Sequence, residues 1–261
     1  MDTPADSTEF IHRLWDELAD FDAARSDEAL DHLLSALCHL VDAQNANWIG
    51  AVRMGNILPG DPVGGWRPRY IDYLHPLRQV VEKTEEQVRM LEAGVIDITT
   101  VKNVSFAGRF RCNLLADLVP PEWFDSDYYH TFYLNSGHAD AIWAGCPVNE
   151  DAEVYFGIFR DAAHSRFSVA DRDAVAYALR GIKWFHRQLM LSHGVLVAAT
   201  MLTPAERTVL HLLLTGLAEK QIAVELGRSY HTTHEYVSSI YRKYGVNNRA
   251  SLMALWLGQS A

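Results

Sequence analysis

The sequence predicts an α+β domain followed by a small all-α module of four helices. Residues 202–261 carry helix-start and helix-stop signals spaced for four short helices. The residues before them mix helical periodicity with short apolar runs typical of buried strands. The chain has 261 residues, which is ample for two domains. We therefore expect a larger domain over residues 1–194, a linker over 195–201 and the module over 202–261.

The first helix of the module has a complete start signal. Thr203 can cap exposed backbone N–H groups, Pro204 suits the first helical position, and Glu206 lies three residues after the cap, as a capping box requires. A helical stripe of apolar residues follows and ends before Gly216; it consists of Val209, Leu210, Leu213 and Leu214. These signals predict a helix that starts at about residue 204.

Two further helices complete a helix-turn-helix pattern. The second is short and stops at Gly227, and its inward-facing residues are Ile222, Ala223 and Leu226. Ser229 can cap a third helix that runs to about Tyr244. Two helices joined by a tight turn with a glycine, the second presented outward, form the arrangement that enters the major groove of DNA.

The third helix divides into two faces. Residues at helical spacing should pack on the first two helices: Thr233, Val237, Ile240 and Tyr244. The opposite face carries polar side chains that can reach base edges and phosphates: His234, Glu235, Ser238, Ser239 and Arg242. Charge spacing alone favours a solvated face of an ordinary helical bundle. The order of cap, turn and outward polar helix shifts the balance toward DNA.

Three segments of the module, residues 202–206, 216–223 and 240–246, resemble the LuxR-type helix-turn-helix of bacterial transcription regulators. The resemblance implies that the third helix recognises double-stranded DNA and that the protein is a homodimer. It also implies a dimer contact on a fourth helix, which would begin at about Asn248 and use Leu252, Leu255 and Trp256.

The resemblance and the helix faces together give an expected DNA-binding set. The phosphate contacts are Lys220, Thr232, Arg242 and Lys243, and the base-reading residues are His234, Glu235 and Ser238; Ser229 and Thr233 complete the set. The chain departs from the family at the start of the third helix, where a Thr-Val-Lys run is usual. Here a histidine replaces the fixed cation. Ala218 stands where a polar residue usually caps the second helix.

The charge is distributed unevenly along the chain. The formal net charge is −10, but residues 201–261 carry six Lys or Arg against four Asp or Glu, so the module is +2 and the remainder −12. This asymmetry directs contact with DNA to the module and keeps the acidic domain away from it. Because +2 is modest, we expect binding to depend on dimerisation.

Other function classes find little support. Cys38, Cys112 and Cys146 are far apart and suggest neither a zinc site nor a disulfide framework. There is no Gly-rich phosphate loop, zinc-protease signature or nucleophile elbow, so we expect no enzyme activity, no catalytic residues, no metal and no cofactor. The acidic, polar N-terminus and the lack of a long apolar run predict a soluble cytoplasmic protein without a membrane association.

The N-terminal domain reads as alternating helices and strands. Helices are expected at 8–19, 27–43, 75–93 and 169–193, strands at 48–52, 139–146 and 154–159, and a loop at 56–68. This order suggests a sensory domain of the GAF or PAS kind, and the segment Phe167–Asp173 is similar to the helix that closes GAF-like domains. The acidic pattern of a phosphorylation receiver is missing, and the pocket pattern of the acyl-homoserine-lactone receptors is not matched.

Aromatic residues concentrate between residues 66 and 159, as an apolar ligand pocket would require. The expected ligand-binding residues are Trp66, Tyr70, Arg109, Arg111, Tyr129, Tyr133 and Trp143. Any single ring fits a core position as well, because aromatic residues dominate most cores.

The sequence as a whole predicts a bacterial transcriptional regulator that binds a two-fold DNA operator as a dimer. The N-terminal domain would sense a small-molecule effector. An alternative stays open, in which this domain only binds a protein partner or only dimerises. RNA polymerase is a further candidate partner.

Overall fold

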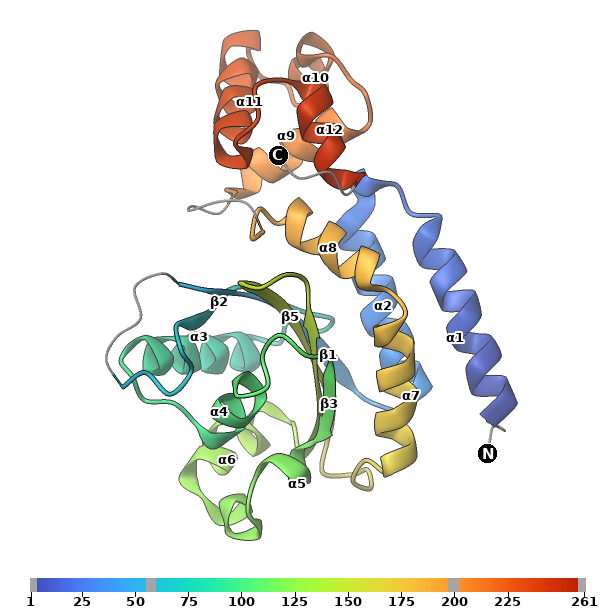
Figure 1. The fold of residues 1–261 in the computed structure, drawn as a ribbon, viewed down its shortest axis with the longest axis vertical. Coiled ribbons are helices and arrows are strands. Elements are labelled where there is room, and N and C mark those ends of the chain that lie inside the picture. Colours follow the sequence, from blue (N-terminus) through green and yellow to red (C-terminus); the bar gives the residue numbers. More distant parts are fainter. Residues whose placement is uncertain (1–3, 55–59, 197–201, 258–261) are drawn as a thin grey trace. The chain divides into compact units, whose positions relative to one another are not determined.

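The computed structural model describes residues 4–54, 60–196 and 202–257 (Figure 1). It divides into two compact units. Residues 1–16 and 31–183 form the first, which we call the sheet unit, and residues 17–30 and 184–261 form the second, which we call the helical unit. The predicted fold class is confirmed: an α+β part is followed by an all-α module. The expected boundaries at residues 194 and 202 stay a prediction, and most of the expected linker lies outside the described residues.

A five-stranded antiparallel sheet organises the sheet unit. Its strands are β1 (Asn45–Arg53), β2 (Trp66–Tyr73), β3 (Arg111–Leu114), β4 (Asp140–Pro147) and β5 (Ala152–Arg160). The order across the sheet is β2-β1-β5-β4-β3, with every neighbouring pair antiparallel. All nine residues of β5 are buried, because this central strand is covered on both faces.

Helices cover the two faces of the sheet (Figure 1). On one side lie α7 (Val169–Arg180) and the sheet-unit parts of α1 (Pro4–Ala19) and α2 (Ser26–Leu40). On the other side lie α3 (Arg78–Glu92), α4 (Ile98–Val104), α5 (Leu115–Leu118) and α6 (Asp127–Phe132), with 3-10 turns at Pro121–Asp125 and Leu134–Ser136. Trp15 fastens α1 to α7 by donating its indole N–H to the Ala178 carbonyl at 2.8 Å.

Two sequence expectations for the sheet unit are wrong. The expected loop at 56–68 overlaps β2, which begins at Trp66 and contains Pro68; a proline is tolerated there because β2 is an edge strand. The single helix expected at 169–193 is two helices, α7 and α8 (Lys183–Ser192). They part at Gly181, where an added Cβ would lie 2.4 Å from the Trp15 ring.

The helical unit contains α8 and the four helices of the module. These are α9 (Pro204–Leu214), α10 (Glu219–Glu225), α11 (Tyr230–Tyr244) and α12 (Arg249–Trp256); a 3-10 turn at Ala23–Arg25 also belongs to the unit. The expected caps are confirmed, since Thr203 and Glu206 form a capping box and the Ser229 hydroxyl accepts the Thr232 N–H at 3.0 Å. Within the described residues, no helix is long and apolar enough to cross a bilayer.

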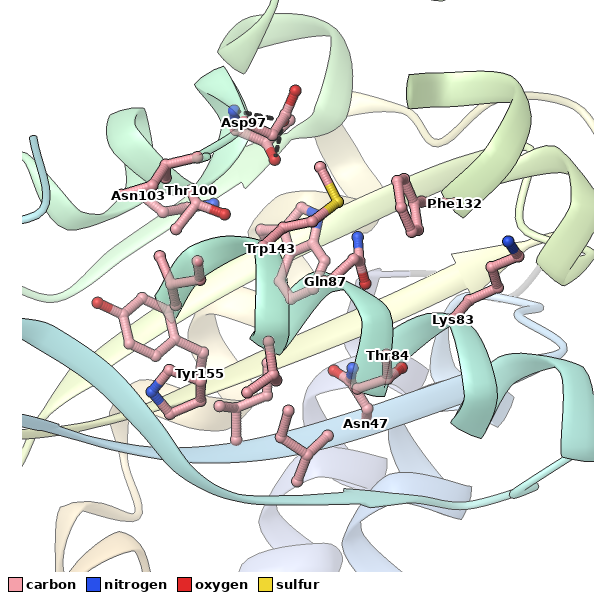
Figure 2. Close-up of a pocket in the computed structure, with 18 of the residues that line it drawn as sticks. Asn47, Lys83, Thr84, Gln87, Asp97, Thr100, Asn103, Phe132, Trp143 and Tyr155 are labelled. Atoms are coloured by element: carbon pink, nitrogen blue, oxygen red, sulfur yellow. Dashed lines mark hydrogen bonds between the residues drawn. The ribbon is translucent and has the colours of Figure 1, made fainter. Parts of the chain in front are cut away.

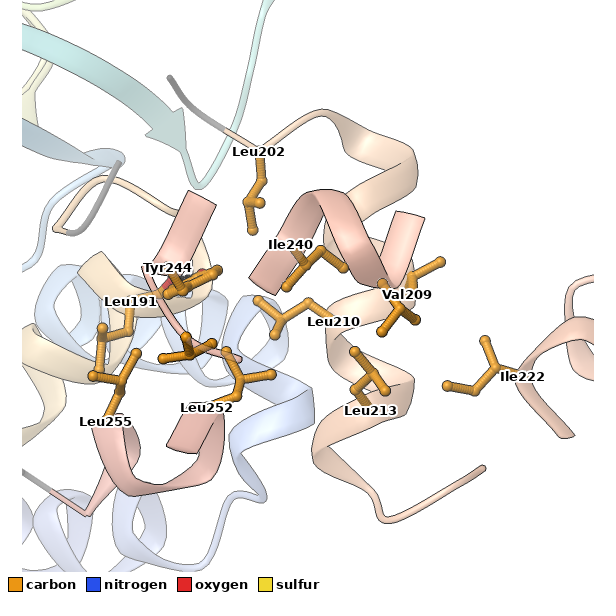
Figure 3. Close-up of a cluster of buried hydrophobic side chains, with 12 residues drawn as sticks. Leu191, Leu202, Val209, Leu210, Leu213, Ile222, Ile240, Tyr244, Leu252 and Leu255 are labelled. Atoms are coloured by element: carbon orange, nitrogen blue, oxygen red, sulfur yellow. Dashed lines mark hydrogen bonds between the residues drawn. The ribbon is translucent and has the colours of Figure 1, made fainter. Parts of the chain in front are cut away.

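Leu191 from α8 completes the core of the module (Figure 3). The other buried members of this cluster are Leu202, Val209, Leu210, Leu213, Ile222, Val237, Ile240, Tyr244, Val246, Leu252 and Leu255. The Tyr244 hydroxyl donates to the Leu191 carbonyl, and Arg207 of α9 pairs with Asp27. Residues that precede the expected linker are therefore part of the packing of the module.

Glu206 ties α9 to the third module helix. Besides its capping role, the buried carboxylate accepts the Ser239 hydroxyl and the Lys243 ammonium, each at 2.7 Å. Burial alone would raise the pKa of Glu206, but the donors from Lys243, the Thr203 backbone and Ser239 outweigh burial and lower the pKa to about 2. The position of α11 on α9 therefore depends on an ionised Glu206.

A buried ion pair joins β3 to β5 in the sheet unit. Arg111 donates to both oxygens of Glu153, at 3.1 and 2.7 Å, and to the Tyr155 hydroxyl at 2.9 Å. Glu153 also accepts the Gly108 N–H at 2.6 Å, which holds the loop after α4. Arg111, which was expected to bind a ligand, therefore uses its guanidinium to hold Glu153 and Tyr155.

We predict that Glu206→Gln destabilises the fold most at neutral pH. The folded pKa of Glu206 lies below the ordinary value of 4.5, so its contribution is complete above pH 4.5 and is lost as the pH falls toward 2. The loss at pH 7 should reach up to about 3 kcal/mol and shrink at lower pH. Urea unfolding at pH 7, 5 and 3 measures it. Glu225→Gln, an exposed change on α10, is the control; an equal loss at every pH would contradict the linkage.

We also predict that Arg111→Met destabilises the sheet unit by about 3–5 kcal/mol, because the Glu153 carboxylate is left buried without its partner. The double variant Arg111→Met with Glu153→Leu should regain at least half of this loss, since both charges are then removed. Denaturant unfolding followed by circular dichroism checks both. A double variant less stable than the single one would argue against an electrostatic origin.

Candidate DNA-binding face and candidate ligand pocket

α11 presents a polar face that packing holds in place. Thr233, Val237, Ile240 and Tyr244 are buried on the inner side, as expected. The outer side carries four exposed residues of the predicted DNA-binding set, His234, Glu235, Ser238 and Arg242. A rigid helix with a row of exposed polar side chains has the form required to read base edges.

Several side chains of this face already have partners within the module. His234 Nδ1 lies 2.9 Å from Glu219 of α10, and Glu235 lies 3.3 Å from His231 Nε2. Arg242 donates to the Ser239 hydroxyl at 3.3 Å. These contacts are exposed, so they can be exchanged for contacts to DNA at small cost.

The other predicted DNA-binding residues differ in their exposure and partners. Thr233 is fully buried, so its place in the DNA-binding set is corrected to a core position. Lys243 is ion-paired with Glu206 and its side chain is only 15% exposed, which removes it from the outer face. Ser229 and Thr232 bond to each other at the start of the helix, while Lys220 is exposed at the start of α10.

Two exposed basic residues at the entry of α11 are absent from the predicted set. Arg228 precedes the Ser229 cap and donates to the Tyr236 hydroxyl at 3.0 Å, and its guanidinium lies over the Tyr236 ring. His231 stands in the first turn of the helix. Arg228 directly precedes the predicted Ser229 cap in the sequence, which is the signal that could have identified it.

The residues of the predicted dimer contact belong to the core of the single chain. Leu252 and Leu255 are buried in the core of the helical unit, and Trp256 packs against that core. Leu255 also offers its carbonyl to Arg187 of α8 at 3.5 Å. In this arrangement Leu252 and Leu255 do not form a surface that a second copy can reach.

A cavity of about 170 Å³ lies in the sheet unit between the sheet and α3 and α4 (Figure 2). Side chains alternate between the faces of a strand, and in β1, β4 and β5 the odd-numbered residues point toward the cavity. They include Asn47, Ile49 and Ala51 of β1, Trp143 of β4, and Tyr155 and Phe159 of β5. Gly157, between the last two, leaves space that a Cβ would close, because that atom would lie within 3 Å of Trp143, Phe159 and Asn47.

The cations of the cavity wall are paired with acidic side chains, and its Asp97 carboxylate is held by hydrogen bonds. Lys83 pairs with Glu86 at 2.9 Å and Arg67 with Asp61 at 3.0 Å. Asp97 accepts three hydrogen bonds, from Trp123 Nε1 and from the amide and hydroxyl of Thr99. Burial lowers the pKa of His138 to about 4, so this imidazole is neutral at physiological pH and stacks on Phe159 with ring centroids 4.0 Å apart.

The structure separates the predicted ligand-binding residues. Trp66, Tyr133 and Trp143 line the cavity, whereas the other four do not: Tyr70, Arg109, Arg111 and Tyr129. Tyr70 packs against Trp48 instead, and Tyr129 donates its hydroxyl to the Ala139 carbonyl. The lining residues Asn103 and Ser136 were not predicted, because neither lies on a recognisable aromatic or charged pattern.

Comparison with known proteins bears on both parts of the chain. The family GerE, "Bacterial regulatory proteins, luxR family", matches residues 200–256. The probable HTH-type transcriptional regulator GfsR of Streptomyces halstedii is 40% identical over 57 residues, which cover 22% of this chain and 24% of that protein. The response regulator Rre1 of Synechocystis is 41% identical over 51 residues, 20% of this chain and 22% of that protein. The match thus spans about a quarter of the length of these relatives.

A solved structure resembles the chain over its whole length. SdiA in complex with octanoyl-rac-glycerol aligns with a TM-score of 0.50 and 13% identity, and the alignment covers 99% of this chain and 96% of SdiA. At this identity the likeness concerns the fold. The resemblance noted in the sequence is confirmed, because residues 200–256 match the luxR family of bacterial regulatory proteins.

Proposed function

We propose that this protein is a bacterial transcriptional regulator that acts in the cytoplasm and binds double-stranded DNA through α11. The exposed polar face of α11, fixed on a buried stripe and capped by Ser229, carries this proposal. His234, Glu235 and Ser238 would meet base edges, and Arg242, Lys220 and Thr232 would meet phosphates.

The DNA-bound form would be a homodimer on a two-fold operator whose half-sites lie about one helical turn apart. The modest charge of the module supports this part, because one copy has few cations with which to bind phosphates. The dimer contact would lie elsewhere than on Leu252 and Leu255, or would form after α12 has moved away from α8.

The cavity in the sheet unit would hold a small-molecule effector. Its apolar and aromatic wall supports this role, and SdiA, which shares the fold, is known in complex with octanoyl-rac-glycerol. A ligand that favours one conformation of the sheet unit would shift the population of DNA-competent molecules. The chain offers a short path for this shift, since only Gly181 and Ile182 separate α7 of the sheet unit from α8 of the helical unit.

We predict that the double variant Ser238→Glu with Arg242→Glu abolishes sequence-specific DNA binding. Two carboxylates on the outer face of α11 would repel phosphate and remove one cation, at no cost to the core because both residues are exposed. Selection of bound fragments from the protein's own genome, followed by gel shifts over a salt series, measures the loss.

Arg78→Glu is the control, because it reverses one charge on the exposed surface of α3 in the sheet unit. It should leave DNA binding within about twofold of the wild type, since Arg78 is outside the proposed DNA-binding set and exposed charges are screened by salt. Enrichment of the same fragments by the double variant would show that α11 does not read DNA. Binding that no small molecule alters would favour an input through a protein partner.

A further inference from the structure

Two polar atoms in the cavity wall have no hydrogen-bond partner among the described residues. They are Oδ1 of Asn103, on α4, and Oγ of Ser136, on the 3-10 turn before β4. Both residues are almost fully buried, with 6% and 4% of their surface exposed. Leaving such a group unpaired in a folded protein is unfavourable, and native structures contain few of them.

The other polar side chains of the cavity have hydrogen-bond partners, unlike these two atoms. The Tyr73 hydroxyl bonds to Thr84 at 2.8 Å, and Gln87 donates to the Tyr128 hydroxyl at 2.8 Å. Asp97 has its three donors. Asn103 and Ser136 are therefore exceptions in a wall whose other polar groups satisfy one another.

The two atoms differ in the hydrogen-bond partner that they require. The Asn103 amide oxygen only accepts, so it requires an N–H or O–H group, whereas the Ser136 hydroxyl can donate or accept. Lys83 and Arg67 are paired with acidic side chains and His138 is neutral, so no free cation of the described wall compensates an anionic ligand. The Asp97 carboxylate already accepts three hydrogen bonds.

We propose that Asn103 and Ser136 are the polar recognition residues of this cavity. Its ligand is a neutral, largely apolar molecule that carries a hydrogen-bond donor, which Asn103 Oδ1 accepts. Ser136 bonds to a second polar atom of the same molecule. This inference rests on the proposed effector role of the cavity and adds the chemical class of the effector.

Three matched probes test the ligand class on the full chain by isothermal titration calorimetry. N-octylacetamide has one N–H donor, N-methyl-N-octylacetamide lacks it, and octanoate carries a charge. We expect the first probe to bind about tenfold more tightly than the second, because one buried donor–acceptor bond is lost. Octanoate should bind most weakly of the three.

Two variants test the residues. Asn103→Leu keeps most of the side-chain volume and should remove the tenfold preference for N-octylacetamide, while the ligand-free protein keeps or raises its melting temperature. Ser136→Ala should weaken N-octylacetamide severalfold, again without a loss of stability. Asn135→Ala, an exposed change on the same 3-10 turn, is the matched control and should bind as the wild type does.

The outcomes separate this inference from the proposed function. A loss of affinity in either variant without a lower melting temperature supports recognition by that residue. Equal binding of both amides to the wild type and to both variants overturns the inference, since water would then satisfy the two atoms. The cavity would still be a ligand site. No binding of any probe to the wild type overturns the ligand class and removes the support for the effector role.

Discussion

The packing of Leu191 against Tyr244 is the contact on which the helical unit depends. Tyr244 is the last residue of α11, and its hydroxyl bonds to the Leu191 backbone in a core with no water access to replace it. Leu191 belongs to α8, which precedes residues 197–201 in the chain. The orientation of α11 is therefore linked to a helix outside the module, and the core of the module includes a residue that precedes it in the chain.

Hydrogen bonds at the end of α8 and an ion pair of α9 also hold the helical unit together. His193 donates its Nδ1–H to the Leu189 carbonyl at 2.9 Å, and its Nε2 accepts an N–H of Arg207 Nη2 at 3.0 Å. These two partners fix the tautomer of a neutral ring. Burial, together with the Arg207 charge, lowers the pKa of His193. Arg207 in turn pairs with Asp27. A neutral histidine can sit against this guanidinium, whereas a protonated one would repel it.

Local signals in the sequence predicted most of the module, and long-range pairing explains what was missed. The caps at Thr203 and Ser229 act within three residues, so they are visible without the fold. Arg111 was mistaken for a ligand contact because its partner, Glu153, is 42 residues away and only the sheet brings them together. The edge strand β2 was missed because Pro68 argues against a strand until its edge position is known.

The cavity illustrates the same limit. The aromatic cluster between residues 66 and 159 indicated a pocket, and three of its predicted members line it. Which ring faces the cavity depends on strand register. Tyr70 pairs with Gly50 and therefore lies on the face of Trp48, whereas the shift in pairing after Gly50 brings Trp66 to the cavity face. Asn103 and Ser136 carry no pattern in the sequence, because an unpaired buried atom can be recognised only when every neighbour is placed.

In the proposed function, α11 combines a fixed scaffold with weak individual contacts. His234 contacts Glu219, and Glu235 contacts His231. Each would have to lose this partner before it contacts DNA. Lys243 is held by Glu206, which leaves the outer face with fewer cations than the sequence suggests. One module would then bind weakly, and two linked modules would gain mainly from the high effective concentration of the second. In the proposed dimer, control of the distance between the two modules would therefore change DNA binding without any change within α11.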